Sequence, residues 1–341
     1  MKGMKIDSYA LARMVGVSQA TVSRAFTRPE KVSATTRKKI MEAARTLGYT
    51  PDRHASALRR KGTSTIVLLH IHRGDQKYWT NIRRNQWIFA EAVLSLTGFF
   101  ENLPYHLEIR NVDSVFSVNP LLMKEHCDGV IVFDFVSEEE ARAITTWEIP
   151  YVFCHRASHL DSFNHSATDN LAGGRLQASY LIKQGSINPA YIMNDEDPFS
   201  HPLRLRGFTE SFPSVAIINE DDRTQRTSRV IQSIRSNAID GLAFVNDALL
   251  VQTLTDIAAD GIQEQQTFPV IGYDNSTVLL VLEQVPASIE IGIAKIYRDA
   301  AAALIELIEG EQRDVSLVHE PELVLSGQDN FRLENAKHLD R

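Results

Sequence analysis

Residues 16–26 have the sequence GVSQATVSRAF, and this stretch connects two short helical patterns. Gly16 can adopt the positive φ that reverses a chain, and Ser18 can cap a helix that runs from Gln19 to Phe26. Val22 lies four residues before Phe26, so both face the same side of that helix. The stretch predicts two helices joined by a tight turn, a helix-turn-helix whose second helix is narrow enough for the major groove of DNA.

The flanking residues supply the rest of a small helical core. A first helix begins at Asp7 or Ser8, ends at Met14 and offers Leu11 and Ala12 to the core. Ser33 can cap a third helix, which Gly48 ends. The apolar residues of that third helix recur at helical spacing and are Ile40, Ala43, Ala44 and Leu47. The sequence thus predicts a three-helix head over residues 1–50.

The outward residues of the second helix have the chemistry of a DNA-reading surface. Gln19 can read a base edge, and Ala20 can contact only an apolar group such as a thymine methyl. Thr21, Ser23 and Arg24 can reach phosphates or bases. Each of these side chains taken alone is more often simply exposed to solvent, but the whole pattern in register favours DNA binding.

The charge distribution agrees with a head that binds a polyanion. Residues 1–61 contain 14 Lys and Arg against 4 Asp and Glu, whereas the remaining 280 residues contain 22 against 39. Clustered cations neutralise phosphates, and an acidic remainder does not compete for them. A merely solvated basic helix would give the same charge. The charge therefore supports the helix-turn-helix prediction but does not by itself indicate DNA binding.

A short segment after the head, Pro51–Arg60, is expected to act as a hinge. Asp52 can cap a helix of barely two turns, which is too short to be stable alone in water. It should therefore fold only on DNA or against a second copy of itself. The alternative is a flexible linker.

From residue 65 onward, apolar runs alternate with helical patterns, which predicts parallel sheets buried on both faces. The expected strands are 65–71, 106–112, 129–135, 149–154, 190–194, 215–218, 241–246 and 269–274. The expected helices are 81–96, 120–126, 137–147, 169–185, 204–212, 227–236 and 248–261. The fold class is therefore an all-α head followed by an α/β body of two doubly wound lobes.

Ligands of open parallel sheets bind beyond the carboxyl ends of the strands, so the residues that follow strands are candidate contacts. They are His70, His72, Arg73, Asp134, His155, Arg156, Asn194, Asp195, Asn246, Asp247, Asp274 and Asn275. Carboxylates and amides bind neighbouring sugar hydroxyls, and Arg204 can clamp oxygens. Tyr78 and Trp79 could supply an apolar ring face. A surface salt bridge for Arg204 and a strand-end turn for Asp274 are the plain alternatives.

Other chemistries find little support. Cys127 and Cys154 are too few for a disulfide framework, and we expect both to be core residues. His70 and His72 would share a strand face, but no third metal ligand follows from the sequence, so neither a metal nor a cofactor is expected. No signal peptide or long apolar segment is evident, which predicts a cytoplasmic protein without membrane contact.

The head resembles the DNA-binding domain of the lactose-repressor (LacI/GalR) family of bacterial transcription regulators. The motifs V-S-x-x-T-V-S-R, V-S-x-x-T-R-x-x-I, L-G-Y-x-P and A-x-x-L occur in family order and spacing. The resemblance implies that Gln19, Ala20 and Arg24 lie over bases, and that Tyr9, Ser18, Thr21 and Ser23 belong to the same DNA-contacting surface. It also implies that Ala55 packs two hinge helices together while Leu58 wedges into the minor groove. Ala10 replaces the acidic residue that the family usually has there.

The body is similar to the effector domain of that family, itself similar to periplasmic sugar-binding proteins. The segments IPYVFCHR, ATDNLAGGRLQASYLIKQG, RLRGF, VNDAL, VIGYDNS and residues 292–324 carry this resemblance. It implies that Arg204, Asn246 and Asp274 contact an effector. His72, Asp134, Tyr78 and Trp79 are further candidates because of their places after strands or in the first strand-to-helix loop. The segments GSINPAYI, PASIEI and LSGQ depart from the family's usual residues, so no particular ligand is implied.

These observations divide the chain into a head (1–50), a hinge (51–63), an effector-binding body (64–333) and a tail (334–341). Lobe one is expected over about 64–163 plus 290–322, and lobe two over about 164–289 plus 323–333. The resulting hypothesis is a repressor that binds a palindromic operator as a homodimer, or a higher oligomer, under control of a sugar-like effector. A purine or a phosphorylated sugar stays open, as does whether the ligand releases or promotes DNA binding.

We expect the first lobe and the helix near 81–96 to form the dimer contact. Trp87, Ile88, Val93 and Leu96 are more apolar side chains than packing against one sheet face requires. The alternative is that all four lie in the core.

The second functional hypothesis is a sugar-acting enzyme with an added DNA-binding head. No phosphate-binding loop or nucleophile elbow occurs, and Gly173-Gly174 lies within a helical pattern, where it favours close packing.

Overall fold

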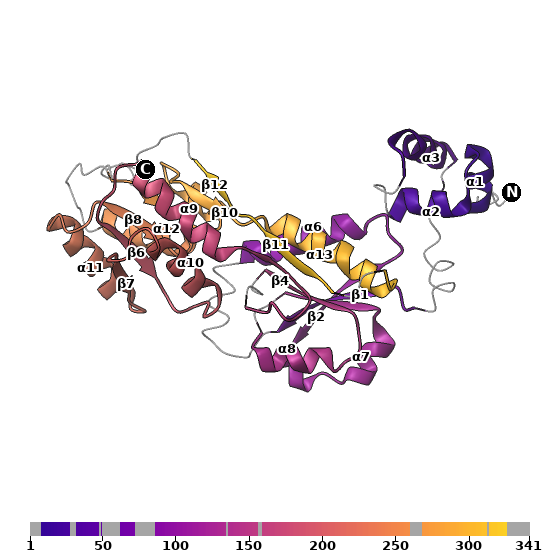
Figure 1. Ribbon diagram of the computed structural model, residues 1–341, viewed down its shortest axis with the longest axis horizontal. Coiled ribbons are helices and arrows are strands. Elements are labelled where there is room, and N and C mark those ends of the chain that lie inside the picture. The colour runs from indigo at the N-terminus through magenta and orange to yellow at the C-terminus, as the bar shows by residue number, and fades with distance from the viewer. Residues whose placement is uncertain are drawn as a thin grey trace.

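The computed structural model describes residues 8–27, 32–47, 49, 62–71, 86–133, 136–155, 159–259, 268–311 and 314–325. A small helical head lies at one end, and two α/β lobes follow it (Figure 1). Several sequence predictions lie outside these ranges: the hinge with Ala55 and Leu58, the candidate contacts His72, Tyr78, Trp79 and Asp134, and the tail.

The head contains α1 (Ser8–Val15), α2 (Gln19–Thr27) and α3 (Ala34–Leu47). Gly16 has a φ of 74°, and the backbone N–H of Thr21 donates to Ser18 Oγ at 3.0 Å, so the predicted turn and cap are confirmed. Ser33 caps α3 in the same way through Thr36. Leu11, Ala12, Val22, Ala25, Ile40 and Ala44 form the buried core of the three helices.

The first lobe is built on a six-stranded parallel sheet in the order β11-β5-β4-β3-β1-β2. Its strands are β1 (Thr65–Ile71), β2 (His106–Val112), β3 (Gly129–Val132), β4 (Tyr151–His155), β5 (His165–Thr168) and β11 (Ser316–His319). The helical elements of the lobe are α6 (Gln86–Phe100), η2 (Val115–Ser117), α7 (Pro120–His126), α8 (Glu138–Thr145) and α13 (Ile293–Ile308). Strand β3 is buried throughout, and β1 is buried at every residue after Thr65, as their continuous apolar sequences predict.

The second lobe has a four-stranded parallel sheet in the order β7-β6-β8-β9. Its strands are β6 (Pro189–Met193), β7 (Ala216–Asn219), β8 (Gly241–Phe244) and β9 (Val270–Ile271). Around them lie α9 (Asn170–Lys183), α10 (Ser200–Thr209), α11 (Arg223–Arg235), α12 (Asp247–Ala259) and η3 (Thr277–Val281). Both lobes therefore have the doubly wound architecture that the alternating pattern predicts.

The chain crosses between the lobes after β5, after β10 (Ser288–Glu290) and before β12 (Glu322–Val324), and β10 pairs with β12 as an antiparallel ribbon. The structure moves one expected boundary, because β5 hydrogen-bonds to β4 in the first-lobe sheet and so lies beyond the limit at residue 163. The sequence prediction omitted β5, β10, β11 and β12. These strands have three or four residues each, and β5 is polar, so they lack a periodic apolar signal.

The burial of α6 shows which of the four residues predicted for the dimer contact lie in the core. Ile88 and Leu96 of α6 are buried in the core, and Trp87 and Val93 are partly buried against it. Leu94 is instead the exposed apolar residue of this helix, with 72% of its surface accessible. The alternative that these four residues serve the core is thus favoured.

In the described ranges no helix is long and apolar enough to span a membrane.

Helices α9 and α10 approach each other so closely that only glycine fits at the contact. A Cβ on Gly174 would lie 1.9 Å from the carbonyl oxygen of Arg204, and one on Gly207 would lie 2.1 Å from that of Leu171. A Cβ on Gly173 would lie 1.9 Å from the Tyr273 hydroxyl oxygen. The interpretation of Gly173-Gly174 as packing residues therefore agrees with the geometry, and the contact fixes the backbone from which Arg204 projects.

We predict that Gly174→Ala lowers the stability of the chain by roughly 1–3 kcal/mol, the usual cost of overpacking, because α9 and α10 must separate. The thermal unfolding midpoint of the purified protein measures this effect. Gly98→Ala is the matched control, since Gly98 also lies in a helix but a Cβ added there would meet no atom within 4 Å. The free energy of unfolding of that control should rise by about 0.5–1 kcal/mol, because alanine is more stable than glycine in a helix interior. Equal melting temperatures for Gly174→Ala and the wild type would contradict the close contact.

Candidate effector site and DNA-contacting helix

Arg204, Asn246 and Asp274 come together at the carboxyl edge of the second-lobe sheet. Asn246 follows β8, Asp274 follows β9, and Arg204 reaches this edge from α10. Arg204 Nη1 lies 3.3 Å from Asp274 Oδ1 and donates a hydrogen bond of 2.7 Å to the carbonyl of Val245. The sequence prediction placed Arg204 at the start of its helix, whereas the helix begins one turn earlier, at Ser200.

The guanidinium of Arg204 is held at Nε, at Nη1 and on one face of its plane. Its Nε donates to Asn170 Oδ1 at 2.9 Å, and its central carbon lies 3.7 Å from the centroid of the Tyr273 ring. Only 4% of Arg204 is exposed. Burial alone would lower its pKa, but the negative charge of Asp274 favours the cation, and the pKa of Arg204 is raised overall. The result is a buried cation with fixed orientation.

Asn246 has a structural contact as well as a place at the sheet edge. Its Oδ1 accepts a hydrogen bond of 2.8 Å from the backbone N–H of Leu249, which caps the start of α12. This leaves the amide NH₂ as the group that Asn246 can offer to a ligand.

Asp274 lies in a backbone turn that a buried carboxylate supports. Asp247 is completely buried, and its Oδ2 accepts from the Ser276 backbone N–H at 2.7 Å. Its Oδ1 accepts from Ser288 Oγ at 2.8 Å. Burial, followed by the charge of Asp274, raises the pKa of Asp247 well above its ordinary value. Asp247 was among the strand-end residues of the sequence, but its supporting role depends on contacts with residues far away in the chain.

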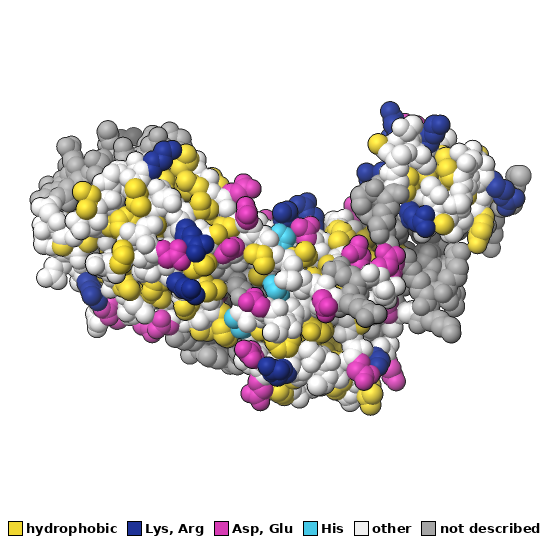
Figure 2. All heavy atoms as spheres, viewed as in Figure 1, with side chains coloured by type: hydrophobic (Ala, Val, Ile, Leu, Met, Phe, Trp, Pro, Cys, Tyr) yellow, Lys and Arg dark blue, Asp and Glu magenta, His cyan; other side chains and the backbone are white. Residues whose placement is uncertain are grey.

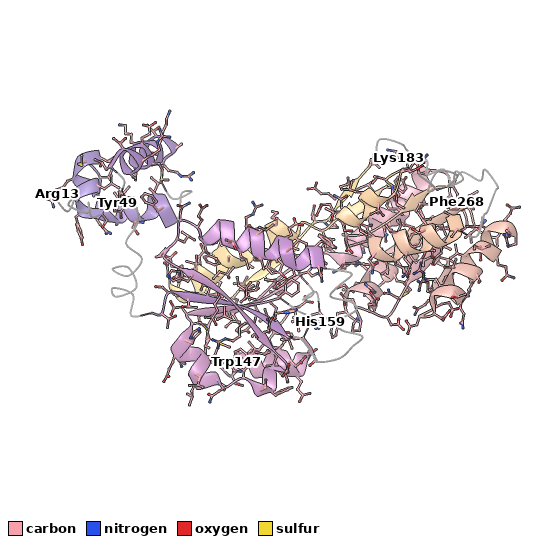
Figure 3. The ribbon with its side chains drawn as sticks, turned by 180° about the vertical axis from the view of Figure 1, so that it is seen from behind. Arg13, Tyr49, Trp147, His159, Lys183 and Phe268 are labelled. Carbon is pink, nitrogen blue, oxygen red and sulfur yellow. The ribbon has the colours of Figure 1, made fainter. Side chains whose placement is uncertain are left out.

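Aromatic and imidazole groups lie at the carboxyl end of β1 in the first lobe. His70 Nδ1 lies 2.9 Å from Asn111 Oδ1, and the ring packs against Phe89 and Phe133. The lobes touch where the ring of His159 stacks on Phe199, with centroids 3.6 Å apart. Figure 3 shows His159 between the two lobes. His159 Nε2 lies 2.7 Å from the Val136 carbonyl oxygen, and burial lowers the pKa of this imidazole. Within the described residues no group of three potential metal ligands occurs.

The DNA-contacting candidates of the head lie on and beside α2. Ala20 and Arg24 are exposed, as is Tyr9 of α1, and Thr21 and Ser23 are half-buried. Gln19 Nε2 donates a long hydrogen bond of 3.4 Å to Ser8 Oγ, so this amide is held loosely. Lys and Arg side chains are spread over the surface of the head, in contrast to the mixed charges of the lobes (Figure 2). Ser18 is committed to capping α2.

Comparison with known proteins agrees with a chain made of a helix-turn-helix head and a two-lobed body. Residues 9–52 match the family model described as bacterial regulatory proteins, lacI family. The HTH-type transcriptional regulator CelR of Thermobifida fusca is 24% identical over 331 residues, which cover 92% of this chain and 96% of that protein. The HTH-type transcriptional repressor PurR of Vibrio cholerae is 23% identical, with 92% and 95% covered.

Solved structures show the same fold over nearly the whole chain. The CelR–cellobiose complex aligns with a TM-score of 0.64 at 23% identity, covering 94% of this chain and 99% of that one. The lac repressor dimer bound to operator and the anti-inducer ONPF aligns with a TM-score of 0.63 at 18% identity, covering 95% and 98%.

The helix-turn-helix head and the two-lobed body agree with these relatives, which are named as a transcriptional regulator and a transcriptional repressor. The head therefore matches the lacI family of bacterial regulatory proteins, and nearly the whole chain is similar to transcriptional regulators.

Proposed function

We propose that the protein is a cytoplasmic transcriptional repressor that binds a palindromic operator as a homodimer and responds to a sugar-like effector. The observation that carries this proposal is the pairing of a basic helix-turn-helix head with a buried Arg204–Asp274 pair at the ligand edge of a separate lobe. One part provides sequence-specific DNA contacts, and the other provides a site for a small polar molecule.

On DNA, the start of α2 would enter the major groove. Gln19, Ala20 and Arg24 would then face base edges, while Tyr9, Ser18, Thr21 and Ser23 would fix the helix against the phosphates. The exposure of Ala20 and Arg24 supports these roles. Ala55 and Leu58 would act in the minor groove once two hinges pair.

The effector is proposed to be an uncharged sugar. Arg204 already has Asp274 as its counter-charge, so the pair presents donors and acceptors without a spare positive charge for an anion. The Asn246 amide adds a neutral donor. The named ligands of related structures point the same way, since one complex contains cellobiose and two others contain ribose. His72, Tyr78, Trp79 and Asp134 are proposed as the first-lobe contacts.

The surface of the body offers apolar groups for a second copy of the chain. Phe116, Leu121 and Leu122 in the first lobe are each more than 60% exposed, as are Leu280 and Val281 in the second. Leu121 and Leu122 are neighbours in α7, as Leu280 and Val281 are in η3, and contiguous exposed apolar patches commonly mark interaction surfaces. A contact that spans both lobes would make the distance between two hinges depend on the angle between the lobes, which links effector binding to operator affinity.

Replacing Arg24 with alanine should weaken binding to the palindromic site about tenfold or more, because one base contact typically contributes 1–3 kcal/mol. DNase I footprinting of the DNA upstream of the chain's own gene and its neighbours identifies the site, and fluorescence anisotropy at fixed salt measures affinity. Arg206→Ala is the matched control, since Arg206 is an exposed arginine of the second lobe. Sequence-independent binding by the wild type would refute the proposed operator function.

A sugar that occupies the second-lobe site should raise the melting temperature of the full chain, because it binds only the folded state. Differential scanning fluorimetry with cellobiose, ribose and a set of related neutral sugars measures this. Asp274→Asn should abolish the rise, since the Arg204 clamp loses its counter-charge. Asp222→Asn should preserve it, because Asp222 only caps α11 and asparagine caps equally well. An undiminished rise in Asp274→Asn would place the sugar elsewhere.

A further inference from the structure

Two consecutive residues of the effector-site turn have left-handed backbone conformations. Asp274 has a φ of 103° and Asn275 a φ of 48°, which are unfavourable for residues other than glycine. Such a turn persists only where neighbouring groups hold it. Ser288 Oγ accepts the Asn275 backbone N–H at 3.0 Å, and the Asp274 N–H donates to the Ile289 carbonyl at 2.8 Å.

The side chain of Asn275 extends this support towards the crossing between the lobes. Its Nδ2 donates to Glu290 Oε2 at 2.9 Å. The other oxygen of the same carboxylate, Oε1, accepts the backbone N–H of Gly292 at 2.7 Å. One carboxylate therefore binds the effector-site turn with one oxygen and the start of α13 with the other.

Gly292 is the point at which the chain enters the first lobe. It has a φ of 68° and precedes α13, which packs against α6 and the first-lobe sheet. The neighbouring Ile291 carbonyl accepts a hydrogen bond of 2.9 Å from Thr168 Oγ1, at the end of the strand where the chain first leaves that lobe. Two of the three crossings are thus joined next to Glu290.

A second carboxylate, that of Glu91 in the first lobe, is affected by the charge of Glu290. Glu91 on α6 is partly buried, and its pKa is raised by that burial and then by the charge of Glu290. The two carboxylates therefore repel each other, in addition to the two hydrogen bonds that position Glu290.

We propose that Glu290 is a positioning residue that ties the Asp274–Asn275 turn to the hinge at Gly292, so that a ligand on Asp274 changes the preferred angle between the lobes. This rests on the proposed effector site. Glu290 does not itself touch the ligand. It transmits a displacement through two charge-assisted hydrogen bonds, each stronger than a bond between neutral groups.

Glu290→Gln is the sharpest variant because it keeps the size of the side chain. A carboxylate accepts at both oxygens with a full negative charge, whereas an amide presents one neutral acceptor and one donor, so neither bond keeps its charge assistance and the bond to Asn275 Nδ2 cannot form unless the amide oxygen leaves the Gly292 N–H. Asn275→Gly removes the same link from the other side and relieves the positive φ. The matched controls are Glu322→Gln, opposite Glu290 in the β10–β12 ribbon, and Asn237→Gly, at a φ of 53° in the second lobe.

Hydrogen exchange of the full-length, ligand-free protein, followed by mass spectrometry, tests the link in both directions. We expect Glu290→Gln to speed exchange in residues 274–276, and Asn275→Gly to speed it in residues 291–295, by about tenfold, as loss of a charge-assisted hydrogen bond implies. The two controls should leave both segments unchanged. If Asn275→Gly alters only its own turn and Glu290→Gln alters only the start of α13, then Glu290 is a helix cap and the proposal is wrong.

The lobe angle itself is measured by electron spin resonance distances between labels on Glu139→Cys and Ser236→Cys, which are exposed on different lobes and lie outside the proposed contact between subunits. The native Cys127 and Cys154 are buried, and burial raises the pKa of both thiols, so they resist labelling. Glu290→Gln should broaden the distance distribution relative to Glu322→Gln, and identical distributions would overturn the proposal. Neither measurement uses operator DNA or sugar, so a failed footprint would count only against the proposed function.

Discussion

The second lobe depends on one buried ion pair, Arg204 with Asp274. A guanidinium with 4% exposure is costly to bury without partners, and Asn170, Val245, Tyr273 and Asp274 supply them. Those partners come from separate segments of the chain that meet at one edge of the sheet. The pair therefore fixes the arrangement of that edge, and any ligand there must be compatible with its charge balance.

The packing around the pair explains why small residues occur in its neighbourhood. Arg204 is presented by α10, and α10 can approach α9 only because Gly174 and Gly207 have no side chains at the contact. The same contact brings Asn170 within hydrogen-bonding distance of Arg204 Nε. Sequence, helix packing and site geometry are thus directly linked: the glycines set the helix distance, and the helix distance sets the reach of the arginine.

Much of this organisation follows from the sequence, because helix caps and apolar periodicity are local signals. Ser18, Ser33 and Gly16 predict the head, and continuous apolar strands predict the two parallel sheets. Contacts between distant residues carry no local signal, which is why the roles of Asp247 and Glu290 emerge only from the structure. Likewise, periodicity cannot distinguish residues that face the core from residues that face a partner subunit. In the structure both Ile88 and Leu96 are buried in the core. Strand β5 escaped prediction because its sequence, HSAT, is polar although fully buried.

The proposed effector site and the DNA-binding head should share one conformational equilibrium. Thermodynamic linkage requires that a sugar and the operator change each other's affinity by the same factor, typically about 5- to 150-fold. The most direct test is to titrate the full-length protein with operator at saturating sugar and without it, and then with sugar at saturating operator and without it. We expect that the sugar changes the operator affinity and that the operator changes the sugar affinity by the same factor, and that this factor differs from one. A sugar that binds at Asp274 and leaves operator affinity unchanged would contradict the shared equilibrium.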